Sequence, residues 1–239
     1  MKKLFCIPHA GASAMIYLKW QKYFPDIKII PVEVSGRGAR FKEERKPSLI
    51  IESEDLYRFI KKNVDPEDSF AVFGHSMGCF MAFEVVRRLI KEKYYRKRLT
   101  HVFFSGNRAP HLNCKSEYRS ETYKLSEKEF EKQVLDEGGT SAEVFENKSL
   151  FSVFVPILRA DYKITESYFY PENDIPRLEC DISIMNGLQD RLSKYEVAQW
   201  EKYCSENNEF DIQYFDGGHF YMDNVPDKVA SYINMKLLA

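Results

Sequence analysis

Short runs of β-branched and aromatic residues recur along the chain, and most are followed by turn residues and then by apolar positions at helical spacing. The strands that these runs predict are Leu4–Ile7, Ile29–Val34, Phe70–Phe73, His101–Ser105, Ile182–Met185 and Phe210–Phe215. Strands that alternate with helices favour an α/β fold with a mostly parallel sheet, right-handed crossovers and helices on both faces. The nearly continuous apolar letters of the third and fourth runs are typical of central strands that are buried on both sides.

Helix patterns occupy the intervals between these strands. Apolar residues at helical spacing predict one helix over Ser53–Val64 and another over Cys79–Ile90. Ser193 and Glu196 form a capping-box pair that predicts a helix from Ser193 to Cys204. A last helix is expected to begin near Pro226, because proline is favoured in the first turn, and to run towards Leu238.

The segment from about residue 116 to residue 170 breaks the alternation, because it contains no convincing strand. One helix pattern starts at Ser126 with a capping box and stops at Gly138, and another covers Leu150–Leu158, where Pro156 interrupts it. A helical insertion between two strands predicts a lid over the carboxyl ends of the sheet, where the sites of open α/β sheets lie. Ordinary packing against an edge of the sheet is the alternative.

Composition and charge exclude several classes of protein. The chain has 239 residues, 44% of them hydrophobic, which suits a single domain over residues 1–239. The 35 Lys and Arg residues balance 36 Asp and Glu residues, so no global field favours nucleic acid or an anionic membrane surface. No stretch approaches the ~20 apolar residues of a membrane span, and the apolar start is too short for a signal peptide.

The five cysteines are scattered and lack the paired spacing of a zinc or redox site, which fits a reducing cytoplasm. We therefore expect a soluble, cytoplasmic protein that carries no metal and no cofactor. A monomer is expected because the chain shows no coiled-coil or other association signal.

One motif carries chemistry. The third predicted strand runs into Gly74-His75-Ser76-Met77-Gly78 and then into a helix. This is the G-x-S-x-G pattern of α/β hydrolases in its strand-to-helix context, where the glycines avoid collisions and the serine hydroxyl stands above the sheet. N–H groups at the start of the helix favour negative charge beside the serine. The motif predicts a nucleophile at Ser76, and a tight structural turn is the alternative.

Ser76 needs a base, because a free serine hydroxyl is a poor nucleophile at neutral pH. In α/β hydrolases the triad follows the chain order Ser, acid, His, and of the five histidines only His219 follows the last predicted strand. Asp190 lies in the loop after the fifth strand, whereas the loop after the fourth contains no carboxylate. Asp216 is too near the histidine along a tight turn, and Asp161 lies inside the insertion. We therefore predict Asp190 as the orienting acid.

A tetrahedral oxyanion needs two N–H donors. One normally comes from the residue after the nucleophile, here Met77. The second comes from a loop after an earlier strand, and Pro8–Ser13 is the small-residue loop placed for it. We assign this donor to Ala10, with Gly11 as the open alternative.

Six short segments, spread over nearly the whole chain, carry a resemblance to a known family. They are Pro8-His9-Ala10-Gly11-Ala12-Ser13, Gly36-Arg37-Gly38-Ala39-Arg40, Gly74-His75-Ser76-Met77-Gly78, Arg159-Ala160-Asp161-Tyr162, residues 187–190 and Gly217-Gly218-His219-Phe220. Together they resemble the type II thioesterases, the free-standing editing hydrolases of nonribosomal peptide and polyketide synthesis. Ser35 departs from the family, which usually has a proline before Gly36.

The resemblance implies an α/β-hydrolase fold and hydrolysis of a thioester between an acyl group and the phosphopantetheine arm of an acyl or peptidyl carrier protein. Such enzymes remove aberrant acyl groups that block a synthetase. Without the resemblance, the residues predict only the transfer of an acyl group to water. A carboxylesterase or acyltransferase of the same fold, or a non-catalytic carrier-binding module, is the alternative.

Two groups of basic residues can serve either the site or the scaffold. Arg37 and Arg40 lie in the GRGAR segment, and we favour anchoring of that loop, because arginine makes bidentate structural contacts. A second cluster can contact an acidic carrier protein, although a charge run at a helix end is more often a solvated face. That cluster consists of Arg87, Arg88, Lys91, Lys93, Arg96, Lys97 and Arg98.

Overall fold

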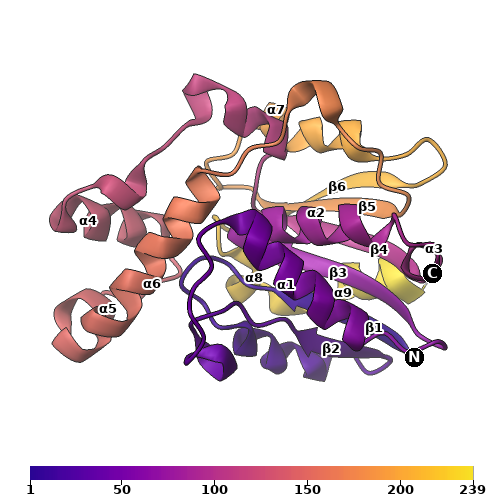
Figure 1. The fold of residues 1–239 in the computed structure, drawn as a ribbon, viewed down its shortest axis with the longest axis horizontal. Coiled ribbons are helices and arrows are strands. Elements are labelled where there is room, and N and C mark those ends of the chain that lie inside the picture. Colours follow the sequence, from indigo (N-terminus) through magenta and orange to yellow (C-terminus); the bar gives the residue numbers. More distant parts are fainter. Residues whose placement is uncertain (239) are drawn as a thin grey trace.

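A computed structural model describes residues 1–238 and contains a six-stranded sheet (Figure 1). The strands are β1 (Lys2–Ile7), β2 (Ile27–Pro31), β3 (Ser69–His75), β4 (Leu99–Ser105), β5 (Asp181–Gly187) and β6 (Phe210–Phe215). Their order across the sheet is β2-β1-β3-β4-β5-β6, and each neighbouring pair is parallel. The predicted α/β sheet is therefore confirmed, and all six predicted strands are present.

Helices connect and cover the strands. The α-helices are α1 (Leu49–Lys62), α2 (Met77–Leu89), α3 (Lys93–Arg96), α4 (Glu127–Glu137), α5 (Glu143–Glu146), α6 (Lys148–Glu166), α7 (Lys194–Ala198), α8 (Tyr221–Asn224) and α9 (Pro226–Leu238). The 3-10 helices are η1 (Ala14–Tyr23), η2 (Gly38–Arg40), η3 (Pro110–Cys114), η4 (Ser116–Tyr118), η5 (Thr122–Lys124), η6 (Glu172–Asp174) and η7 (Gln199–Tyr203). No helix within residues 1–238 is long and apolar enough to cross a membrane.

Two apolar cores lie on opposite faces of the sheet. On one face α1, α2 and η7 cover the sheet, and on the other η1, α8 and α9 do so. Successive residues of β3 alternate between these cores, with Phe70 and Val72 in one and Ala71 and Phe73 in the other. Figure 1 shows α1 and α2 on one side of the strands and α9 on the other. The helices leave the carboxyl ends of the strands free to carry loops.

The capping signals predicted helix starts correctly. A capping box at Ser126 precedes α4, which ends at Gly138, and a second box at Ser193 precedes α7. The single helix predicted from Ser193 to Cys204 is α7 continued by η7. The last helix, α9, begins at Pro226 as predicted.

The start of α1 and the end of β2 differ from the prediction by several residues. Helix α1 starts at Leu49 rather than Ser53, because the Ser48 hydroxyl caps it by accepting a hydrogen bond from an amide of the first turn. Ile50 and Ile51 are 46% and 47% exposed. Because these apolar residues face solvent, the first turn lacks the amphipathic pattern that predicts a helix. Strand β2 ends at Pro31 rather than Val34, because its partner β1 ends at Ile7 and Pro31 has no N–H to donate.

Residues 116–170, which lie between β4 and β5, contain α-helices and 3-10 helices and no strand, as predicted. Helix α6, however, runs without a break through Pro156, which was expected to interrupt it. Proline removes one helical hydrogen bond, and the carbonyl that it leaves free belongs to Ser152. Both residues are exposed, so water can solvate that carbonyl. In Figure 1, α4, α5 and α6 form a group to the left of the strands.

Candidate active site

The turn between β3 and α2 holds Ser76 in a strained conformation. Ser76 has φ 54° and ψ −115°, and it is the only non-glycine residue with positive φ among those that the structure describes. A Cβ atom at Gly74 would overlap the Gly78 carbonyl oxygen, and one at Gly78 would overlap the Ile7 carbonyl oxygen. Both glycines are therefore required by close backbone approaches. Such strain costs about 1–3 kcal/mol and is typical of functional sites.

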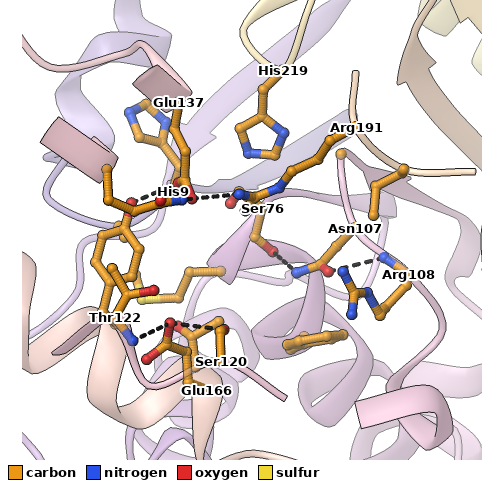
Figure 2. Close-up of a pocket in the computed structure, with 18 of the residues that line it drawn as sticks. His9, Ser76, Asn107, Arg108, Ser120, Thr122, Glu137, Glu166, Arg191 and His219 are labelled. Atoms are coloured by element: carbon orange, nitrogen blue, oxygen red, sulfur yellow. Dashed lines mark hydrogen bonds and ion pairs between the residues drawn. The ribbon is translucent and has the colours of Figure 1, made fainter. Parts of the chain in front are cut away.

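Asp190 and His219 meet at the carboxyl ends of β5 and β6. The Nδ1 atom of His219 lies 2.8 Å from Oδ2 of Asp190, whose side chain is almost fully buried. A carboxylate at Nδ1 favours the tautomer with its proton there, which leaves Nε2 as an acceptor. Figure 2 shows the His219 ring above Ser76, and both line one pocket. The structure thus brings together the three residues predicted as nucleophile, acid and base.

Two further imidazoles lie close to His219. The ring centroid of His75 lies 5.0 Å from that of His219, and Nδ1 of His75 is 2.8 Å from the Ser105 hydroxyl oxygen. Burial lowers the pKa of His75 well below its ordinary value, and burial lowers the pKa of His9 to about 4. Both rings are therefore neutral at pH 7. Neither opposes a positive charge that develops on His219 when it accepts a proton.

The amides of Ala10 and Met77 line the pocket and are free to donate. Within residues 1–238, neither N–H has a protein acceptor. The N–H of Gly11, by contrast, donates to Oδ2 of Asp161 at 2.7 Å. Gly11 was the open alternative for the second oxyanion donor, and its N–H is already engaged by Asp161, whereas that of Ala10 is not.

A buried ion pair fixes the loop that carries Ala10. Arg37 binds both carboxylate oxygens of Asp161 on α6, and the two residues are 4% and 1% exposed. Arg40 bonds to Glu43 and to Asp55 on α1. Both arginines therefore anchor the scaffold, as favoured from the sequence. The role of Asp161 was not foreseen, because its partners lie 124 and 150 residues away in the chain.

Ser35 also has a structural explanation. Its N–H donates to Oε1 of the buried Glu52 at 3.0 Å, and its hydroxyl donates to Oε2 of the same carboxylate at 2.5 Å. A proline at this position has no N–H to donate. In this chain, Ser35 therefore takes part in holding the start of the GRGAR segment against α1.

Replacing Asp161 with alanine should lower the free energy of unfolding by about 3–5 kcal/mol, because Arg37 would remain buried without a counter-charge. Urea denaturation measures this change. The double variant Arg37→Met, Asp161→Leu removes both charges and should be clearly more stable than Asp161→Ala. A loss below about 1 kcal/mol in the single variant would show that the pair is not buried in solution.

The pocket beside Ser76 has a volume of about 450 Å³, and the insertion forms much of its wall. Arg191, next to Asp190, binds Glu137 at the end of α4 at 2.6 Å, and the Tyr162 hydroxyl donates to the same carboxylate. Gly139 lies against the ring of Phe220, so close that a Cβ there would overlap it. Residues of the insertion therefore line the pocket, and the role of the insertion as a lid stays a prediction. No cluster of His, Cys, Asp or Glu within residues 1–238 is arranged to hold a metal ion.

The second basic cluster lies away from this pocket. Arg87 and Arg88 both bind the buried Glu84, and Arg98 packs over the ring of Tyr94. The cluster begins in the last turn of α2 and continues beyond it, whereas Ser76 precedes the amino end of this helix. Thirteen helical residues span roughly 20 Å, so this group does not border the pocket.

Comparisons with known proteins agree with this geometry. The model of the thioesterase domain family matches residues 2–237. Linear gramicidin dehydrogenase LgrE of Brevibacillus parabrevis is 32% identical, over 98% of this chain and 87% of its own length. Gramicidin S biosynthesis protein GrsT of Aneurinibacillus migulanus is 29% identical, over 92% of this chain and 82% of its own length.

Solved structures show the same similarity. ClbQ from the colibactin NRPS/PKS pathway superposes with a TM-score of 0.86 at 30% identity, over 98% of this chain and 96% of ClbQ. YbtT, a type II thioesterase from the yersiniabactin NRPS/PKS pathway, superposes with a TM-score of 0.83 at 29% identity, over 99% of this chain and 92% of YbtT. One structure of YbtT carries a serine-to-alanine substitution.

Proposed function

The chain belongs to the thioesterase domain family, and on that premise we propose that it hydrolyses acyl thioesters on the phosphopantetheine arm of acyl or peptidyl carrier proteins. In this role it removes aberrant acyl groups that block a nonribosomal peptide or polyketide synthetase. The similarity to ClbQ and YbtT, which are named for NRPS/PKS pathways, supports this function. The five free cysteines suit a reducing cytoplasm as the place of the reaction.

The observation that carries the proposal is the strained Ser76 in a pocket with the His219–Asp190 pair. In the acylation step, Oγ of Ser76 attacks the thioester carbonyl carbon while Nε2 of His219 takes the hydroxyl proton. Asp190 keeps the ring in the required tautomer and stabilises its charged form. The carbonyl oxygen becomes an oxyanion, which the N–H groups of Met77 and Ala10 hold.

Collapse of the tetrahedral intermediate breaks the carbon–sulfur bond. His219 gives its proton to the departing sulfur, so the phosphopantetheine leaves as a thiol and the acyl group stays on Ser76. A water molecule then attacks the acyl carbonyl while His219 takes one of its protons. The second intermediate releases the carboxylic acid, and the proton returns to Oγ of Ser76. The steps use only groups of the chain, the substrate and water.

A comparison of matched substrates tests this function. An acyl-pantetheine thioester and the corresponding oxygen ester, with the same acyl group, should differ in kcat/KM in favour of the thioester. Steady-state kinetics on purified protein measures both constants. Strong preference for the oxygen ester would contradict the proposal and favour a carboxylesterase of the same fold. Failure of a fluorophosphonate probe to label the folded protein would favour the non-catalytic module.

A further inference from the structure

One peptide group carries both a part of the nucleophile turn and an oxyanion donor. Its carbonyl belongs to Ser76 and its N–H belongs to Met77. Because a peptide group is planar, a contact that fixes the direction of the carbonyl also fixes the direction of the N–H. Whatever holds the Ser76 carbonyl therefore aims the Met77 N–H.

Asn107 holds that carbonyl from outside the nucleophile turn. Its side-chain Nδ2 donates to the carbonyl oxygen of Ser76 at 3.0 Å, and Figure 2 shows this contact beside the pocket. The same oxygen accepts the N–H of Cys79 at 2.9 Å, which is a bond within the start of α2. Asn107 therefore supplies the link that ties the peptide to the loop after β4.

The neighbours of Asn107 fix which end of its amide faces Ser76. Its Oδ1 accepts the backbone N–H of Arg108 at 2.9 Å. A backbone N–H can only donate and a carbonyl can only accept, so the oxygen must face Arg108 and the nitrogen must face Ser76. Both hydrogen bonds are satisfied in this orientation, and neither is satisfied in the flipped one.

Asn107 is itself held by the core. Its backbone carbonyl accepts the indole N–H of Trp200 at 2.9 Å. Trp200 is fully buried and stacks on Phe104 of β4, with ring centroids 4.1 Å apart. The side-chain amide therefore projects from a rigid support, which suits a residue that positions another group.

We propose that Asn107 is a positioning residue for the oxyanion hole, acting through the peptide that joins Ser76 to Met77. It fixes the plane of this peptide in a turn whose strained φ would otherwise favour relaxation. By donating to the carbonyl it also polarises the peptide and strengthens the Met77 N–H as a donor. The inference rests on the proposed catalytic roles of Ser76 and Met77.

The test compares two asparagines that make the same kind of contact. Asn234 on α9 donates from Nδ2 to the carbonyl of Tyr23 at 2.9 Å, and it lies outside the pocket. Asn107→Ala should lower kcat by roughly 10- to 100-fold, less than the loss on removing an oxyanion donor outright, with KM changed little. Asn234→Ala should leave both constants close to those of the wild type.

A transition-state analogue separates positioning from a general structural effect. In a trifluoromethyl ketone analogue of acyl-pantetheine, Oγ of Ser76 adds to the ketone carbon, its proton passes to Nε2 of His219 and the ketone oxygen becomes the oxyanion. Asn107→Ala should weaken this inhibitor by about the same factor as kcat. Binding of an uncleavable acyl-pantetheine amide should stay unchanged.

Two results would overturn the inference. A raised KM with unchanged kcat would make Asn107 a substrate contact, and an equal loss for both analogues would make its role structural. Cleavage of acyl-pantetheine by the wild type is measured separately, so failure of the positioning role can be distinguished from failure of the proposed function. Suppose that the ketone binds the wild type more tightly than Asn107→Ala, as expected, but that the wild type does not cleave acyl-pantetheine. The thioesterase assignment then fails and the positioning role stands.

Discussion

Replacing Ser76 with alanine should lower kcat by about 10⁵- to 10⁶-fold, to the level that binding and the oxyanion hole supply without a nucleophile. The Ser76 hydroxyl makes no hydrogen bond to protein within residues 1–238, so its removal costs little folding free energy. We therefore expect a thermal midpoint close to that of the wild type. Thioester turnover and thermal denaturation on the same preparation measure the two effects.

Ser231→Ala, on the exposed surface of α9, is the matched control and should keep full activity. Activity of Ser76→Ala within tenfold of the wild type would contradict a covalent mechanism through this residue. Loss of activity together with a large fall in the thermal midpoint would instead assign Ser76 to the fold.

Asp190→Asn should lower kcat by about 10⁴-fold. The amide of asparagine donates to Nδ1 of His219, so the ring proton moves to Nε2 and the base can no longer accept the serine proton. The charged imidazole also loses its counter-charge. Steady-state kinetics at pH 7 to 8 measures the loss, and KM should change little because Asp190 does not line the pocket.

Asp216→Asn is the matched control for Asp190→Asn. Asp216 lies three residues before His219, but its side chain is 72% exposed and, within residues 1–238, forms an ion pair only with Lys228. This variant should keep wild-type activity. A large loss in Asp216→Asn together with normal activity in Asp190→Asn would move the acid to Asp216.

The sequence predicted the sheet because its signals are local. A short apolar run in the sequence indicates a buried strand, and a capping box indicates where a helix begins, as at Ser126 and Ser193. The end of β2 and the start of α1 were predicted wrongly because the apolar residues there do not follow the local element. Val32 and Val34 are buried in a loop beyond β2, and Ile50 and Ile51 are exposed in the first turn of α1.

The site was predictable to the extent that chain order and motif determine it. Ser76, Asp190 and His219 each lie in the loop or turn that follows a predicted strand, and their order along the chain is that of the α/β-hydrolase triad. The contacts that support the site depend on tertiary packing instead. Asp161 reaches Gly11 because α6 packs against the loop after β1, and no local sequence pattern indicates this contact.

Asn107 is an intermediate case. Strands β3 and β4 are parallel and neighbouring, with His75 opposite Ser105. This register places the residues that follow both strands at the same edge, so Asn107 had to lie near the nucleophile turn. The loop after β4 contains no carboxylate, so the argument for a triad acid gave Asn107 no role.

Cleavage of acyl thioesters on carrier proteins through Ser76 is the reaction that we propose for this chain. The most direct measurement is release of acetate from an acetyl-phosphopantetheinyl carrier protein, with wild type and Ser76→Ala in parallel. We predict release by the wild type and none above background by the variant. No release by a wild-type protein that still cleaves oxygen esters would contradict this proposal, and it would leave an esterase in the same pocket.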